Sequence, residues 1–142
     1  MISGKASFTY KEKTVKAAGG SCSSYNIIYL FECSVCGLRY VGRSTRALRT
    51  RVGEHRRAFY KMCDNKEYDI ESDEFALGHH LFSEHKLNHR EDFDMNYRVS
   101  ILDICSPRVL DVKEHTFIHS LNTLNPNGLN LENPFAIPLL YR

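Results

Sequence analysis

The sequence predicts a single α+β domain in which strands and helices share one modest core. Three observations lead to this prediction. Two stretches with strand-like composition flank a tight turn near residue 35, a third lies near residue 100, and helix start signals precede the segments between and after them. The chain has 142 residues, 42% of them apolar and 25% charged, which suits one soluble globular domain.

The first part of the chain predicts a linker followed by a hairpin. Residues 1–24 are dominated by Lys, Ser and Gly and predict a flexible lead, so the folded domain is expected over 25–142. The stretch YNIIYLFEC predicts a strand over 26–33, CSVCG a tight turn, and LRYVGR a second strand over 38–43. The short turn makes this pair an antiparallel hairpin.

Two helices are expected to follow the hairpin. Ser44 and Thr45 offer an N-cap to a helix that runs to about Tyr60. After a polar loop, Ser72 or Asp73 can cap a second helix with the sequence EFALGHHLFSEH. Alternation in YRVSILDIC then predicts a third strand, near 97–104.

The last helix carries an unusual carboxylate. Ser106 as N-cap and Pro107 at the first helical position start the helix SPRVLDVKEHTFIHSL. One face of it holds Leu110, Glu114, Phe117, Ile118 and Leu121. A buried carboxylate is costly unless it is paired or bound to a metal, so Glu114 is a candidate functional residue. The alternative is a glutamate at the edge of the stripe whose carboxylate reaches solvent.

The net charge of +2 conceals an asymmetry along the chain. Residues 39–57 contain a single acidic residue, Glu54, and these basic residues: Arg39, Arg43, Arg46, Arg49, Arg51, Arg56 and Arg57. Residues 64–74 are instead acidic. Such a division predicts a basic face for a polyanion, of which nucleic acid is the first candidate. The alternative is an ordinary solvated helix face.

The cysteines and the N-terminus indicate a reducing compartment. The chain has no apolar run long enough to span a bilayer, and its polar first twenty residues do not resemble a signal peptide, so we expect no membrane partner. Five cysteines are an odd number, which argues against a fully paired disulfide framework. An intracellular protein is therefore expected, in which close cysteines bind metal.

One set of cysteines and histidines has the composition of a zinc site. Cys33 and Cys36 have the spacing of two thiolates in one turn, and His80 and His85 supply the other two ligands of a tetrahedral ion. His79 remains an alternative to His80. The 43 residues between the two pairs exclude a freestanding finger and predict a clamp between the hairpin and the later helix. The alternative is two buried thiols and surface histidines.

Several separated motifs together resemble a known nuclease family. IIY at 27–29 is followed after ten residues by YVG at 40–42, then by Arg51 and His55. The segment KEHTFIHSLNTLNPNGLN adds Glu114 and Asn130 in the family's order. The chain resembles the GIY-YIG endonuclease superfamily, and its cysteines and histidines resemble the zinc-containing endonuclease domain of Penelope-like retrotransposons. Ile27 and Val41 depart from the family pattern, but neither position supplies chemistry.

The resemblance implies a small central three-stranded antiparallel sheet flanked by helices, with an added Cys2His2 zinc site. It implies metal-dependent hydrolysis of DNA phosphodiesters, with structural Zn²⁺ and catalytic Mg²⁺ or Mn²⁺. It also implies a nuclear protein in which a reverse transcriptase is covalently linked to this domain. A zinc-stabilised nucleic-acid-binding module without catalysis and a zinc-dependent protein-interaction domain remain alternatives. Cleavage specificity, nicking against double-strand cleavage, and oligomeric state stay open.

The chemistry of phosphodiester cleavage suits the residues that carry the resemblance. Glu114 can hold a divalent ion, and Arg51 can donate two hydrogen bonds to phosphate oxygens. Tyr29 or Tyr40 can act as general base, and which of the two is left open. His55 can relay a proton or orient a tyrosine. The remaining expected contacts are positioning by Asn130 and DNA phosphate binding by Ser44 and the six arginines at 39, 43, 46, 49, 56 and 57.

Overall fold

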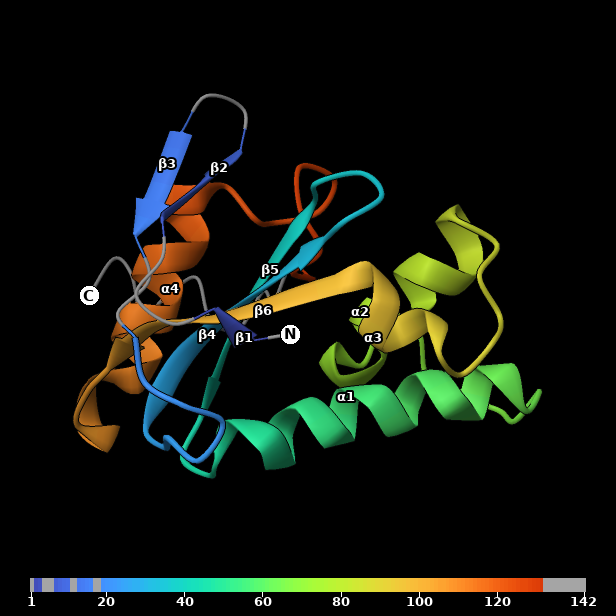
Figure 1. Cartoon of the computed structure of the whole chain (residues 1–142), viewed down its shortest axis with the longest axis horizontal. Helices are drawn as coiled ribbons and strands as arrows, with labels where there is room; N and C mark the ends of the chain where they lie inside the picture. The colour runs from blue at the N-terminus through green and yellow to red at the C-terminus, as the bar shows by residue number, and fades with distance from the viewer. Residues whose placement is uncertain (1, 4–6, 11–12, 17–18, 132–142) are drawn as a thin grey trace.

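The computed structural model describes residues 2–3, 7–10, 13–16 and 19–131 as an α+β structure, as the sequence predicts (Figure 1). The main sheet has the strand order β1-β6-β4-β5. Helix α1 runs below the sheet in Figure 1 and α4 stands beside it, so the sheet is flanked by helices.

Three antiparallel strands form the body of this sheet. Strand β4 (Ile27–Cys33) lies between β5 (Arg39–Ser44) and β6 (Tyr97–Ile104) and is antiparallel to both. The three predicted strands are therefore confirmed to within one residue at each end. In the hairpin, Tyr29 lies opposite Gly42. This register places Tyr29 beside the YVG segment at 40–42 of β5.

Three short strands lie within the segment for which the sequence predicts a flexible lead. Strand β1 (Ile2–Ser3) pairs with β6 in parallel and extends the main sheet to four strands. Strands β2 (Ser7–Tyr10) and β3 (Lys13–Lys16) form a separate antiparallel hairpin. None of these strand pairings was predicted from the sequence.

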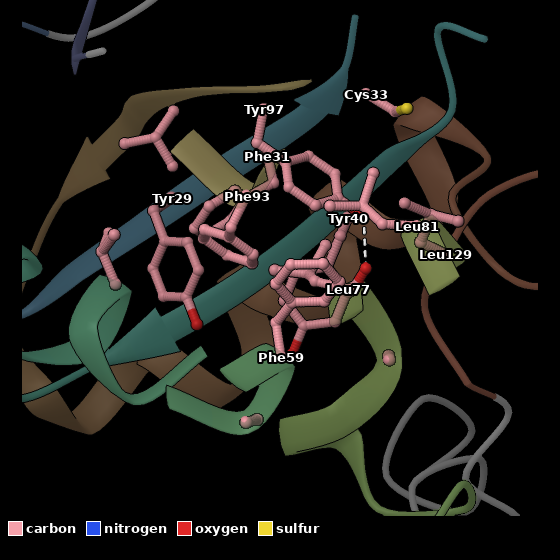
Figure 2. Close-up of a cluster of buried hydrophobic side chains, with 14 of the residues drawn as sticks. Tyr29, Phe31, Cys33, Tyr40, Phe59, Leu77, Leu81, Phe93, Tyr97 and Leu129 are labelled. Carbon is pink, nitrogen blue, oxygen red and sulfur yellow. Dashed lines mark hydrogen bonds between the residues drawn. The ribbon is translucent and has the colours of Figure 1, made fainter. Parts of the chain in front are cut away.

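Both faces of the central strand are buried. Successive side chains of a strand point to opposite faces, so the odd-numbered residues of β4 join the larger core, while Ile28 and Leu30 on the other face join a smaller one. The larger core contains Tyr29 and Phe31 among many aromatic rings (Figure 2). The smaller core packs Ile28 and Leu30 against Leu110 of α4. The sheet therefore presents one face to α1 and the other to α4.

Helix α1 (Leu48–Cys63) begins later than the expected cap at Ser44 or Thr45 and ends after Tyr60. Ser44 still belongs to β5, where it pairs with Ile27. Its hydroxyl accepts the Arg46 backbone N–H at 3.0 Å and so closes a turn ahead of the helix. The serine is therefore used in the turn, and the helix begins without a side-chain cap.

The predicted second helix is divided into three short pieces. A 3-10 turn η1 (Asp73–Phe75) leads into α2 (Ala76–His79) and then into a π-helical turn η2 (His80–Glu84). Single π-helical turns such as η2 frequently occur at functional sites. The short helix α3 (Asp92–Asn96) then precedes β6.

The last helix begins at the predicted position. The 3-10 turn η3 (Pro107–Val109) continues into α4 (Leu110–Leu121), and the Ser106 hydroxyl accepts the Arg108 N–H at 3.4 Å. Within the described residues, no helix is both long enough and apolar enough to cross a membrane.

Candidate active site and metal centre

The hydroxyl of Tyr29 meets two side chains of α1. His55 Nε2 lies 2.9 Å from the hydroxyl oxygen, and Arg51 Nε donates to the same oxygen at 3.2 Å. Arg51 and His55 are four residues apart, so they lie on the same face of the helix, turned toward β4. Three of the residues singled out in the sequence therefore form one hydrogen-bonded group.

Burial sets the protonation of this group. Burial and then the charge of Arg51 lower the pKa of His55 to about 3, so its imidazole is neutral while Nε2 shares a hydrogen bond with the Tyr29 hydroxyl. Burial also raises the pKa of Tyr29 well above its ordinary value, and the charge of Arg51 offsets this only in part. Desolvation of Tyr29 therefore outweighs the charge of Arg51, which by itself would favour a phenolate.

The second tyrosine has a carboxylate partner. The Tyr40 hydroxyl donates to Asp73 Oδ2 at 2.7 Å, although Asp73 lies 33 residues further along the chain. The Tyr40 side chain is 1% exposed, and burial raises its pKa well above the ordinary value, with the charges of Tyr29 and Asp73 acting the same way. The rings of Tyr29 and Tyr40 lie 6.4 Å apart. Both tyrosines thus belong to one site.

Gly42 and Asn130 fix the second strand of the hairpin. A Cβ atom at Gly42 would overlap the hydroxyl and the adjacent ring carbon of Tyr29, so only glycine fits opposite this tyrosine. The Asn130 side chain accepts the Val41 N–H at 2.9 Å and donates to the Val41 carbonyl at 2.8 Å. Thr123 donates to the same amide oxygen at 2.6 Å. Asn130 is therefore placed to position the strand that carries Tyr40.

Glu114 extends from α4 with its side chain 16% exposed. Arg43 pairs with it at 3.4 Å and with Asp111 at 3.0 Å. Burial raises the pKa of Glu114 to about 7, against the charge of Arg43, and Asp73 adds to the increase. The carboxyl oxygens of Asp111 and Glu114 and a nitrogen of His115 lie within 4.8 Å of one another, so this group can accept a cation. Its oxygen donors suit a hard divalent ion.

The four predicted zinc ligands converge. One donor atom from each of Cys33, Cys36, His80 and His85 lies within 4.8 Å of all the others. Cys36 Sγ lies 3.2 Å from His80 Nε2, Cys33 Sγ lies 3.6 Å from His85 Nε2, and the two histidine nitrogens are 3.1 Å apart. A tetrahedral zinc ion has S···N edges of about 3.6 Å and N···N edges of about 3.3 Å. The cluster can therefore hold a metal such as zinc.

His79 is not part of this cluster. Its Nδ1 lies 3.4 Å from the Tyr68 hydroxyl instead. Burial, and then His85, lower the pKa of His80 to about 4, so His80 offers the neutral nitrogen that a metal needs. Burial raises the pKa of Cys33 to about 11 without a cation, and a bound ion would deprotonate this thiol. The geometry favours His80 over His79.

No family model, curated protein or solved structure matches this chain. The GIY-YIG resemblance therefore remains an interpretation of the motifs, and functional arguments depend on the geometry of the site.

The arginines expected to bind DNA differ in their surroundings. Arg43, Arg46, Arg49 and Arg57 are exposed, and Arg56 is half-buried. Arg46 forms two hydrogen bonds to Glu54, at 2.6 and 2.8 Å, and Glu54 also accepts from Arg51 at 2.9 Å. Arg56 pairs with Asp94 at 3.0 Å. These carboxylates hold the guanidinium groups in place at the surface.

Arg39 and Ser44 do not lie where the sequence suggests. Arg39 is 2% exposed and pairs with Glu32 of the neighbouring strand at 3.2 Å, so its side chain stabilises the hairpin and does not face solvent. Ser44 is buried, and its hydroxyl bonds only to the Arg46 backbone among the hydrogen bonds of the described residues. Neither residue presents a free group to a phosphate.

Sequence reasoning missed the roles of Asp73 and Glu54. Asp73 was expected only as a helix cap, because nothing in the spacing between the hairpin and residue 73 indicates a contact with Tyr40. Glu54 was noted only as the acidic exception in a basic run. It lies three residues after Arg51, which places the two side chains on adjacent turns of α1 and could have indicated their ion pair.

Proposed function

We propose that this chain is a metal-dependent DNA endonuclease of the GIY-YIG type, and that its Cys2His2 cluster holds a structural zinc ion. The observation that carries the proposal is the convergence of Tyr29, Arg51 and His55 in one hydrogen-bonded group. Tyrosines on strands and a histidine on a helix are usually only packed or solvated. Here the tyrosine and the histidine instead form a network with an arginine at one buried hydroxyl, an arrangement that packing alone does not require.

Each side chain has a place in phosphodiester cleavage. Arg51 uses Nε for Tyr29 and one terminal nitrogen for Glu54, which leaves the other terminal nitrogen to donate to a phosphate oxygen. Glu114, with its pKa raised to about 7, would gain from a divalent cation that offsets its charge. When bound there, Mg²⁺ or Mn²⁺ supplies charge stabilisation to the phosphate. His55 holds the Tyr29 hydroxyl in a fixed orientation.

The zinc cluster has a supporting role in this proposal. It joins the turn between β4 and β5 to the segment of α2 and η2, and it contains no open position, because four protein ligands complete a tetrahedron. A closed site of this kind stabilises a fold and does not activate water. The resemblance further suggests a chromosomal target and a linked reverse transcriptase, which belong to the proposal.

A plasmid nicking assay tests the nuclease function. The zinc-loaded protein is incubated with supercoiled DNA and Mg²⁺ or Mn²⁺, beside Glu114→Gln and Arg51→Ala. We expect the Arg51 variant to lose about 10²–10³-fold in cleavage rate, as for removal of other transition-state donors. The exposed Glu71→Gln and Arg108→Ala, neither of which is placed in the site or among the DNA-binding arginines, serve as matched charge controls. Equal residual cutting by wild type and both site variants would contradict the proposal and favour a binding module without catalysis.

A further inference from the structure

The segment after α1 delivers a carboxylate to the paired tyrosines. Asp73 stands at the start of η1, and its Oδ2 accepts the Tyr40 hydroxyl at 2.7 Å. Tyr40 itself is buried, whereas Asp73 is exposed. The pair therefore connects a hydroxyl inside the site to a carboxylate that solvent can reach.

The two tyrosines differ in what can take up a proton from them. The Tyr29 hydroxyl shares a hydrogen bond with His55, whose pKa is lowered to about 3 by burial, and it accepts from Arg51. A group with so low a pKa in a buried position is a poor proton acceptor. Tyr40 donates instead to the carboxylate of Asp73, which is exposed and can exchange a proton with solvent. Among the hydrogen bonds described, only the Tyr40 hydroxyl donates to a group that can pass a proton to solvent.

We propose, resting on the nuclease function above, that Asp73 is the proton acceptor of the cleavage reaction and acts through the Tyr40 hydroxyl. The attacking water gives a proton to the Tyr40 oxygen while the Tyr40 proton moves to Asp73 Oδ2. The water oxygen forms a bond to phosphorus, and the bond from phosphorus to the leaving ester oxygen breaks. The leaving oxygen takes a proton from solvent water, and Asp73 returns its proton to solvent.

This route avoids a free phenolate. Burial raises the pKa of both tyrosines well above the ordinary value, so either phenolate would be scarce near neutral pH. In the relay, Tyr40 loses and gains a proton in the same step and stays neutral. The tyrosine then supplies position, and the carboxylate supplies basicity.

Several charged and titratable groups surround Asp73 and enter any pH dependence. Tyr40 of β5 is its hydrogen-bond partner, and Tyr29 of β4 and Glu114 of α4 interact with its charge. The charge of Arg51 of α1 acts to lower the pKa of both tyrosines, and Glu74 is the residue next to Asp73 in η1. Above about pH 8 Glu114 is ionised, so the alkaline range isolates the proton acceptor from the metal-binding carboxylate.

The test compares single-turnover cleavage rates of zinc-loaded wild type, Asp73→Asn and Tyr40→Phe between about pH 8 and pH 9.5. For wild type we expect a rate that is nearly independent of pH. Asp73→Asn keeps a hydrogen-bond acceptor for Tyr40, and we expect its rate to fall about 10²–10⁴-fold. Its residual rate should rise about tenfold per pH unit, because hydroxide then replaces the missing acceptor. Glu71→Gln, two residues away and exposed, should match wild type.

The outcomes separate this inference from the nuclease function. If wild type cuts DNA and Asp73→Asn cuts at the same rate, the relay is wrong and the nuclease function stands. A wild-type rate that rises tenfold per pH unit above pH 8 would indicate a phenolate and also overturn the relay, even if the variants fail to fold. If Asp73→Asn loses activity but keeps the flat profile, Asp73 only anchors the segment. Absence of cutting by wild type would overturn both proposals.

Discussion

The Tyr29 hydroxyl lies 2.9 Å from Nε2 of His55, and both side chains are completely buried. This pairing places a titratable imidazole in the centre of the larger core, in contact with Phe31 and Tyr40 as well. A histidine in such surroundings ties the stability of the fold to pH.

The stability prediction follows from the lowered pKa of His55, about 3 in the folded chain against about 6.5 when unfolded. Between these values the unfolded chain binds a proton that the folded chain excludes. The free energy of unfolding should therefore be intact above about pH 6.5 and fall toward about pH 3, by at most about 1.4 kcal/mol per pH unit. Denaturant titrations of wild type and His55→Gln at several pH values measure the difference.

Zinc release in acid contributes to both proteins in that comparison, so the relevant quantity is the difference between their slopes. Parallel pH dependence in wild type and His55→Gln would contradict the assigned environment of the imidazole.

The second prediction concerns the metal cluster. Cys36→Ser and His80→Ala should each bind clearly less than one zinc ion per chain and unfold at lower temperature, because binding free energy of a structural ion is folding free energy. His79→Ala should retain one ion, since His79 faces Tyr68. Elemental analysis and thermal melting provide the measurements. Loss of zinc in the His79 variant but not in the His80 variant would reverse the assignment.

The third prediction concerns the divalent ion at Glu114. Its pKa of about 7 means that the carboxyl is mostly protonated at about pH 6 and mostly ionised at about pH 8. The Mg²⁺ concentration for half-maximal cleavage should therefore be about tenfold higher at the lower pH, because a proton and the cation compete for one carboxylate. Titrating Mg²⁺ at the two pH values measures this. If the Mg²⁺ concentration for half-maximal cleavage is the same at both pH values, Glu114 is not the ligand of the divalent ion.

The fourth prediction separates surface arginines from the buried one. Arg49→Ala and Arg57→Ala should each reduce the slope of log affinity against log salt by about 1, because each exposed side chain can displace a counterion from DNA. Arg39→Met should leave the slope unchanged, since Arg39 is buried against Glu32. Binding of a short duplex at several salt concentrations measures the slopes, with folding of each variant checked by circular dichroism. A reduced slope in Arg39→Met would show that it reaches the DNA.

The sequence predicted the parts of the site that depend on local patterns. Alternation placed Tyr29 and Tyr40 on paired strands, and the four-residue spacing placed Arg51 and His55 on one helix face. The metal cluster was also predictable, because thiolates and imidazoles at such spacings have few other uses. The confirmed start of the last helix followed from Ser106 and Pro107.

Other features depend on tertiary contacts that no local pattern reveals. The contact between Tyr40 and Asp73 requires the loop after α1 to fold back over the sheet. The burial of Arg39 depends on Glu32 lying directly opposite in the hairpin register. The late start of α1 arose because strand pairing retained Ser44, which outweighed its preference for a helix cap.

The cysteine and histidine cluster joins positions 44 residues apart, from Cys36 to His80. The stretch of chain closed by this link contains Tyr40, Arg51, His55 and Asp73. By the chain-entropy relation for a cross-link, closing a loop of that length lowers the conformational entropy of the unfolded chain by an amount worth about 4 kcal/mol of free energy. An occupied cluster would thus limit the disordered conformations of the segment that carries most of the polar site. The fraction of chains in which that segment is folded would then depend on the supply of zinc.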